Sequence, residues 1–270
     1  MRALEAVQDW PVDTVAVAVV AADGHVLGEY GPQEHVFELA SVTKLLTAYA
    51  ALMAVEEGAL GLDDSVGPPE STTRHLLAHA SGVAPDARTV VAKVGTRRIY
   101  SNAGFEILAD AVEAATGMPF AVYLGAGVLE PLGMSSSQLA GSPAAGARSS
   151  VADLRRFVAE LQQPRLLASE TVQAATSVAF PGLAGVLPGY GRQDPNDWGL
   201  GYEIRDAKAP HWTGSQSSPE TYGHFGRSGT FLWVDPVAGC GCICLTDRDF
   251  ADWAVDAWPL LTDAILREVS

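Results

Sequence analysis

The sequence predicts a mixed α/β (α+β) fold in which one antiparallel sheet is built from the two ends of the chain. Three observations favour it. Segments rich in β-branched residues lie near both termini, turn signals join them, and helical patterns fill the middle. The 270 residues are 48% hydrophobic and 18% charged, which is typical of a globular core. We expect one domain over 1–270, with a sheet region at about 1–60 and 200–270 and an all-helical insertion at about 61–199.

Hairpins are expected at both ends of the chain. Residues 14–30 contain two β-rich runs around the Asp-Gly dipeptide at 23–24, which is typical of a tight turn. Residues 229–234 and 240–246 flank a Pro- and Gly-containing turn and predict a second hairpin. A closing helix is expected over about 251–268, so that helices flank the sheet.

A strongly apolar helix is expected from about 41 to 57, where Gly58 ends it. Its apolar residues occur on most sides, which predicts a central, buried position. Shorter helices are expected up to Ala80, over 103–116 and over 150–160. The Gly- and Pro-rich stretch 181–199 is predicted to be an ordered loop. A pocket is expected where the sheet and helical regions meet.

The charge balance excludes some classes of partner. A net charge of −15 disfavours nucleic acid and anionic membrane surfaces. No apolar run is long enough to span a bilayer. The first ten residues carry Glu5 and Asp9 and do not resemble a secretory signal. We therefore expect a cytoplasmic protein, unless a signal has been removed, with a small molecule as its substrate. The sequence does not indicate an oligomeric state.

The three cysteines alternate along one predicted strand, at 240, 242 and 244. Alternate residues share a face of a strand, so a three-thiolate metal site is one interpretation. No fourth ligand is obvious, and small buried hydrophobic residues are the interpretation we favour. Adjacent strand thiols also fit a reducing compartment. His75 and His79, spaced by four residues, would share a helix face, but we expect a structural role for them. No metal or cofactor is expected.

The segment Ser-Val-Thr-Lys at 41–44 places the hydroxyl of Ser41 and the amine of Lys44 one helical turn apart. A serine beside an amine is what an activated nucleophile requires. Tyr100 and Asn102 precede a predicted helix and could both point into a cleft, the tyrosine as a proton carrier and the amide as a hydrogen-bond donor. The structural alternative is a core tyrosine with Asn102 as a helix N-cap.

A glycine-rich segment precedes the second predicted hairpin, at 224–230. Glycines let the backbone approach a ligand, and an edge strand beside a nucleophile can offer an N–H to a developing oxyanion. The structural alternative is a glycine-rich strand start with a bulge.

Together these motifs resemble the penicillin-recognising serine hydrolases, and within them the class C β-lactamase branch with its DD-peptidase, D-aminopeptidase and carboxylesterase relatives. The order Ser-x-x-Lys, Tyr-x-Asn and His-x-Gly is similar to that family. So are Thr-Thr-Arg-His-Leu-Leu-Ala-His-Ala-Ser-Gly at 72–82, Glu-Pro-Leu-Gly-Met at 130–134 and the strands at 223–247. The resemblance covers nearly the whole chain. It implies a β-lactamase-like fold and a serine hydrolase that works through an acyl-enzyme.

The resemblance also implies roles for single residues. Ser41 would be the nucleophile, and Lys44 and Tyr100 the base system, with Lys44 helping to hold Tyr100 deprotonated. Asn102 would contact a substrate amide, and the backbone N–H groups of Ser41 and Arg227 would form the oxyanion hole. The substrate would also be bound by one strand segment, which comprises His224, Phe225, Gly226 and Arg227.

This chain departs from the family pattern at one strand. The β-lactamases carry Lys-Thr-Gly where this sequence has His-Phe-Gly at 224–226. Histidine is largely neutral near pH 7 and phenylalanine has no hydroxyl, so recognition of a penicillin carboxylate would depend on Arg227. Only about 56 residues separate Lys44 from Tyr100, which indicates trimmed loops and an open site. Small carboxylic esters or amides are therefore the expected substrates. The alternatives are a β-lactamase, a D-amino-acid-specific peptidase, or a non-catalytic binding module.

Overall fold

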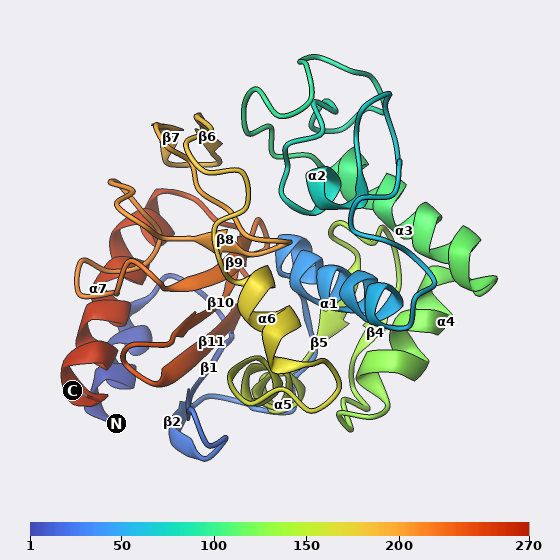
Figure 1. The fold of residues 1–270 in the computed structure, drawn as a ribbon. Helices are drawn as coiled ribbons and strands as arrows, with labels where there is room; N and C mark the ends of the chain where they lie inside the picture. Colours follow the sequence, from blue (N-terminus) through green and yellow to red (C-terminus); the bar gives the residue numbers. More distant parts are fainter. Residues whose placement is uncertain (270) are drawn as a thin grey trace.

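The computed structural model describes residues 1–269, and its centre is a six-stranded antiparallel sheet with the order β2-β1-β11-β10-β9-β8 (Figure 1). The sheet comprises β1 (Val15–Ala21), β2 (Val26–Tyr30), β8 (Glu203–Ile204), β9 (Tyr222–Gly226), β10 (Thr230–Asp235) and β11 (Cys240–Thr246). Strands from both ends of the chain therefore lie side by side, since β1 pairs with β11. This confirms the predicted fold class of an antiparallel sheet with flanking helices.

Both faces of the sheet are covered. One face packs against α7 (Asp252–Val269) and the N-terminal 3₁₀ helix η1 (Arg2–Asp9), and Figure 1 shows the two chain ends close together there. The other face packs against α5 (Val151–Gln162). Because neither face is open to water, β11 is buried along its full length. Its sequence therefore lacks the alternation of polar and apolar residues that marks a half-exposed strand.

The three cysteines lie on the face of β11 that packs against α7, in one apolar cluster with Trp233 and Trp258. All three thiols are free and buried. Burial raises the pKa of each of them, so they remain protonated and unreactive at neutral pH. The structure thus agrees with their interpretation as small core residues.

The helix α1 (Thr43–Glu56) lies between the sheet and the helices of residues 102–129, and its residues from Thr43 to Ala54 are all buried. This agrees with the predicted central position. A 3₁₀ turn, η2 (Ala40–Val42), precedes α1, so Ser41 lies in the turn and Lys44 in the first turn of the α-helix. The other helices are α2 (Thr73–Leu77), α3 (Asn102–Thr116), α4 (Phe120–Leu124), the π-helical turn η3 (Gly125–Leu129) and α6 (Ser169–Ala175).

Two small sheets complete the fold. One contains β3 (Phe37–Glu38), β4 (Gln138–Leu139) and β5 (Ala147–Ser149) in the order β3-β5-β4, and the other pairs β6 (Gly185–Leu187) with β7 (Gly191–Gln193). The β6–β7 hairpin lies inside the stretch that was predicted to be loop only. Each of its strands has three residues, which is too short for an alternating pattern, and Gly189 and Gly191 supply the positive φ angles of the turn.

Ser101, rather than Asn102, is the N-cap of α3, since its Oγ accepts a hydrogen bond from the Gly104 N–H at 2.8 Å. Gly117 ends the helix with a φ of +70°. The structural alternative for Asn102 is therefore wrong, and its side chain is not used for capping.

His75 and His79 do not share a helix face. Helix α2 ends at Leu77, and His79 follows it with a φ of +54°. The imidazole Nδ1 of His79 accepts a hydrogen bond from the Ser101 N–H at 3.1 Å, while His75 bonds to Thr72. The expected shared face is thus wrong because the helix is too short. Within residues 1–269 no group of three or more His, Cys, Asp or Glu side chains is arranged to hold a metal ion.

In the described part of the chain, no single helix combines the length and apolar character that crossing a membrane requires. Among residues 1–269, only α3 together with residues 120–129, a pair bent by 81°, meets the criterion of length and composition.

Candidate active site

Three side chains from two distant parts of the sequence meet at the start of α1. The Tyr100 hydroxyl donates a hydrogen bond to Ser41 Oγ at 2.7 Å, and Lys44 Nζ lies 3.4 Å from the same oxygen. Tyr100 reaches Ser41 from the segment just before α3. The structure thus brings together the three residues predicted to be catalytic, with an amine and a phenol both within reach of one serine hydroxyl.

The amine of Lys44 is enclosed completely, with no exposed surface. It donates to Asn102 Oδ1 at 2.6 Å and to the Ala144 carbonyl at 2.9 Å, and it lies 4.6 Å from the centre of the Tyr100 ring. Burial lowers the pKa of Lys44 to about 7, although the negative charges of Asp86 and Glu106 act in the opposite direction.

At neutral pH a large share of the Lys44 side chains is therefore uncharged, and a neutral amine can accept the proton of a serine hydroxyl. An ordinary lysine, with a pKa of about 10.4, would be almost entirely protonated.

The phenol of Tyr100 behaves differently. Burial raises its pKa above the ordinary value, and the hydrogen bond to Ser41 offsets this only in part. Tyr100 is thus protonated in the resting site. The expectation that Lys44 helps to hold Tyr100 deprotonated is wrong for this state, because the cost of burying a phenolate outweighs the effect of nearby groups.

The amide of Asn102 connects the lysine to the protein surface. Its Oδ1 accepts from Lys44, and its Nδ2 donates to Oδ1 of the exposed Asp86 at 2.8 Å. Asn102 lines the cavity above Ser41, as predicted for a substrate contact. A substrate carbonyl that takes a hydrogen bond from Nδ2 would therefore have to displace Asp86.

The backbone at Ser41 has an unusual conformation. Ala40 has a φ of +44°, in the left-handed region that a residue with a Cβ seldom adopts. This bend starts η2 at Ala40, directly before Ser41. The first N–H groups of a helix have no partner within the helix and carry its positive dipole end, so the Ser41 N–H is suited to stabilise a negative oxygen.

The end of β9 is held against this bend by close contacts. A Cβ on Gly226 would lie 2.3 Å from the Leu39 carbonyl oxygen, so only glycine fits here. Thr230 Oγ1 donates to the same carbonyl at 2.9 Å. Gly226 thus lets Arg227 come beside Ser41, and both of these residues line one cavity. Gly226, predicted to bind substrate, lies behind this cavity rather than in its lining.

The side chain of His224 is buried beside Tyr100 and Trp198, with ring centres 5.6 and 5.4 Å away. Its Nδ1 lies 2.6 Å from the Phe225 carbonyl, which can only accept, so the proton is on Nδ1 and Nε2 is an acceptor. Burial and the charge of Lys44 lower the pKa of His224 to about 3. The imidazole is therefore neutral, as the sequence predicted.

The cavity above Ser41 has a volume of about 270 Å³. Most of its walls are apolar. It is lined by Ser41, Tyr100, Asn102, Leu187, Pro188, Gly189, Trp198, Glu203, His224, Phe225, Arg227 and Phe250. Six of these residues are not among the predicted site residues: Leu187, Pro188, Gly189, Trp198, Glu203 and Phe250. For Pro188 the local signal was the Pro-Gly dipeptide in the predicted loop, but tertiary packing alone brings Trp198 and Phe250 here.

Glu203 in this lining belongs to a buried polar network. Its carboxylate accepts from Lys208, from His211 Nε2 at 2.9 Å and from Trp212 Nε1 at 2.9 Å. Burial alone would raise the pKa of Glu203, but His211 and Lys208 lower it to about 2. The carboxylate is fully paired, so it fixes β8 and the cavity wall rather than offering a free charge.

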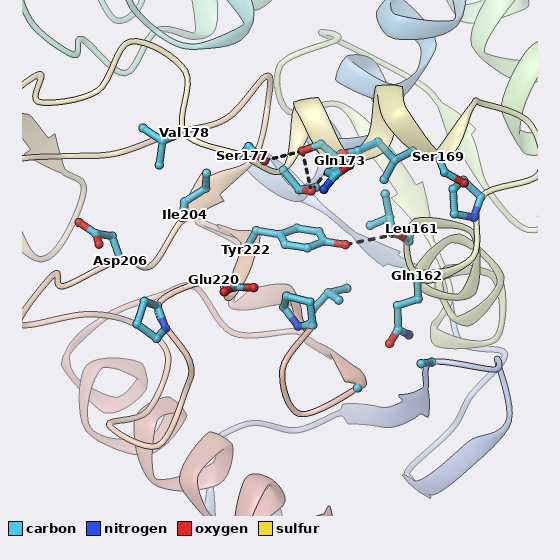
Figure 2. Close-up of a pocket in the computed structure, with 18 residues that line it drawn as sticks. Leu161, Gln162, Ser169, Gln173, Ser177, Val178, Ile204, Asp206, Glu220 and Tyr222 are labelled. Carbon is cyan, nitrogen blue, oxygen red and sulfur yellow. Dashed lines mark hydrogen bonds between the residues drawn. The ribbon is translucent and has the colours of Figure 1, made fainter.

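A larger cavity of about 710 Å³ lies elsewhere, between α6, the end of α5 and the sheet edge (Figure 2). Figure 2 shows Tyr222 reaching from β9 toward Leu161, whose carbonyl accepts from the Tyr222 hydroxyl at 3.4 Å. Its lining contains no residue of the Ser41 cluster. Size alone therefore does not locate the chemistry of this protein.

The fold and this cluster define a serine hydrolase of one family. Residues 11–264 match the family model described as Beta-lactamase, so the chain belongs to that family. Over 99% of both chains it is similar to a crystal structure described as a beta-lactamase from Mycobacterium bovis, with 52% identity and a TM-score of 0.97. The family and the serine hydrolase class predicted from the sequence are confirmed.

Two curated relatives match over shorter stretches. Penicillin-binding protein 4* of Bacillus subtilis is 29% identical over 136 residues, which are 38% of this chain and 30% of that protein. Esterase EstB of Burkholderia gladioli is 29% identical over 177 residues, 44% of this chain and 45% of that protein. Each match thus spans less than half the length of the curated relative.

Proposed function

We propose that this protein hydrolyses small carboxylic esters through an acyl-enzyme formed on Ser41. One observation carries the proposal. The Ser41 hydroxyl lies within reach of a completely buried lysine and accepts a hydrogen bond from a protonated tyrosine. A nucleophile with a neutral amine on one side and a proton donor on the other has what both halves of an acyl transfer require.

In the proposed acylation, Ser41 Oγ attacks the ester carbonyl and its proton passes to neutral Lys44. The carbonyl oxygen becomes an oxyanion between the N–H groups of Ser41 and Arg227, where the start of η2 adds positive potential. As the carbon–oxygen bond breaks, Tyr100 gives its proton to the leaving alkoxide and regains one from Lys44. Water then attacks the acyl carbonyl and gives a proton to Lys44. As the bond to Ser41 Oγ breaks, Tyr100 protonates Oγ and regains a proton from Lys44, so the carboxylic acid is released and the resting site is restored.

The shape of the cavity supports small esters as substrates. Its volume of about 270 Å³ is below the usual range for drug-sized ligands, and Leu187, Trp198, Phe225 and Phe250 provide apolar walls. His224 is neutral, so it places no charge where the related β-lactamases carry a lysine. Small amides fit the same geometry, but an amine is a poorer leaving group than an alcohol.

A β-lactam is the second candidate substrate, because the Mycobacterium bovis relative is described as a beta-lactamase. Arg227 lines the cavity, and its guanidinium has no carboxylate within ion-pair distance among residues 1–269. It is the group that would hold a β-lactam carboxylate.

The test compares four substrates: p-nitrophenyl acetate, p-nitrophenyl butyrate, a chromogenic cephalosporin and a D-alanyl dipeptide. Turnover is measured together with the intact mass of the protein, which detects an acyl adduct. We expect ester turnover and an adduct that are both lost in Ser41→Ala but kept in Ser169→Ala, which changes a serine far from the site. Esterase activity that survives in Ser41→Ala would refute Ser41 as the nucleophile. Cephalosporin turnover above ester turnover would favour a β-lactam as the substrate.

A further inference from the structure

A second cavity, which we call the side cavity, adjoins the one above Ser41. It has a volume of about 580 Å³ and shares Tyr100 and Pro188 with the catalytic cavity. It lies between the segment before α3 and the β6–β7 hairpin. Its lining consists of Pro85, Val91, Arg97, Arg98, Ile99, Tyr100, Ala184, Gly185, Val186, Pro188 and Arg192. The two cavities therefore meet at Tyr100 and Pro188.

The walls of the side cavity are apolar although they face water. Val91 and Val186 keep 51% and 60% of their surface exposed, and both lie outside the packed cores. Exposed apolar side chains that gather in a hollow beside a catalytic serine are typical of a ligand site. This part of the cavity suits a hydrocarbon chain.

The charged side chains of the side cavity are all arginines, and one of them is free to bind a ligand. Arg98 is buried and donates to four backbone carbonyls, and Arg192 is paired with Asp194 at 2.8 Å. Arg97 is exposed, and its guanidinium makes one long contact, 3.5 Å to the Val91 carbonyl. Within residues 1–269 no carboxylate lies within ion-pair distance of it.

This unpaired cation is notable in a chain with a net charge of −15. Most of the protein surface repels an anion, while the rim of the side cavity attracts one. Arginine also binds a carboxylate through two parallel hydrogen bonds, which fixes its orientation.

We propose that the side cavity binds a chain of the substrate that is apolar along its length and carries a carboxylate at its far end, held by Arg97. The preferred substrates would then be esters whose acyl chain or alcohol chain ends in a carboxylate. Residues 97 and 100 are at most about 10 Å apart along the backbone, so an extended six-carbon chain of about 7 Å bridges most of this span and the long Arg97 side chain covers the rest. This inference rests on the proposed ester hydrolysis.

The test uses two series of esters with six-carbon chains that differ only in the end group. The acyl series is p-nitrophenyl hexanoate, mono-p-nitrophenyl adipate and p-nitrophenyl 6-(trimethylammonio)hexanoate. The alcohol series is hexyl acetate and its analogues with a carboxylate or a trimethylammonium group at the end of the alcohol. In one of the two series we expect kcat/KM to be about three- to fivefold higher for the carboxylate than for the neutral ester, the scale of an exposed charge pair.

The matched variants are Arg97→Gln and Lys93→Gln. Each removes one positive charge from an exposed position of the same segment, but Lys93 does not line the side cavity. Arg97→Gln should remove the preference for the carboxylate, and Lys93→Gln should keep it. The preference should also shrink at high ionic strength, because Arg97 is exposed and salt screens it.

The result separates this inference from the proposed function. The neutral esters could be turned over without a carboxylate preference in either series, or with a preference that survives in Arg97→Gln. Either result overturns the proposed role of the side cavity and leaves the proposed ester hydrolysis intact. If no ester is turned over, the proposed function fails, and the adipate half-ester is titrated calorimetrically into Ser41→Ala. If the double variant Ser41→Ala, Arg97→Gln binds the half-ester more weakly than Ser41→Ala does, the proposed role of Arg97 in the side cavity is supported. Equal binding by the two variants, or no binding by either, overturns that role.

Discussion

Asp86 lies outside the cluster of Ser41, Lys44 and Tyr100, yet it affects the charge of Lys44. The carboxylate is exposed and accepts from Asn102 Nδ2 at 2.8 Å, while Asn102 Oδ1 accepts from Lys44 at 2.6 Å. Its negative charge stabilises the ammonium form and so raises the pKa of Lys44 against the effect of burial. Replacing Asp86 by asparagine removes the charge and keeps an oxygen that can accept from Asn102.

The interaction energy between the Asp86 carboxylate and the Lys44 ammonium can be worked out from their separation. The amide of Asn102 spans the two hydrogen bonds, so the opposite charges are about 8 Å apart. Coulomb's law then gives about 0.5 kcal/mol at the dielectric constant of water and about 2 kcal/mol at an effective value near 20. Because Asp86 is exposed, the lower value applies, and it corresponds to a factor of about two to three in the ratio of neutral to protonated Lys44.

The direction of the pH effect follows from the proposed role of Lys44 as a base. With a pKa of about 7, the neutral form is lost as pH falls, so kcat/KM for p-nitrophenyl butyrate should drop below pH 7, about tenfold per pH unit. In Asp86→Asn the pKa of Lys44 is lower, so the decrease in kcat/KM begins at a lower pH. At pH 6 or below, kcat/KM divided by its plateau value should therefore be about two to three times that of the wild type.

The assay is the pH dependence of kcat/KM from pH 5 to 9 for the wild type and two variants. Asp110→Asn is the control, since Asp110 is an exposed carboxylate of α3 that pairs with Arg88. If the decrease in kcat/KM moves to higher pH in Asp86→Asn, or moves equally in Asp110→Asn, the effect of the Asp86 charge on the pKa of Lys44 is refuted. A wild-type profile without a drop near pH 7 would refute Lys44 as the base.

Two further outcomes are expected. Tyr100→Phe should slow acylation by at least about a hundredfold, because it removes the proton donor to the nucleophile, and a near-normal burst rate would exclude Tyr100 from proton transfer. Glu203→Gln should lower the free energy of unfolding by about 3 to 5 kcal/mol in urea, because it leaves buried Lys208 unpaired, whereas the exposed control Glu220→Gln should change little. The pKa of Glu203 is lowered to about 2, so its contribution is complete above about pH 4.5 and is lost toward pH 2. Stability that is flat over that range would contradict this account.

Much of the fold could be predicted from the sequence because long elements carry long patterns. The central strands β1 and β11 have seven residues each, α1 has 14 and α7 has 18, so their apolar patterns can be recognised in the sequence. The β6–β7 hairpin could not be predicted in this way, because its three-residue strands are defined by pairing rather than by composition.

The same distinction between local patterns and tertiary structure applies to the candidate active site. Ser41, Lys44 and Tyr100 belong to short motifs whose spacing can be recognised. The protonation state of Tyr100 could not be predicted, because it depends on how deeply the folded chain buries the phenol. The Ala144 carbonyl that binds Lys44 has no local signal either, since it is placed 100 residues away by the path of the chain between α3 and β5.

The bend before Ser41 is held from far along the chain. The carbonyl of Leu39 accepts from Thr230, which is 191 residues later in the sequence, and Gly226 packs against the same carbonyl. The oxyanion site proposed between Ser41 and Arg227 therefore exists only after the C-terminal hairpin has joined the sheet. We therefore expect a chain that is truncated before β9 to contain Ser41, Lys44 and Tyr100 but to lack the proposed esterase activity.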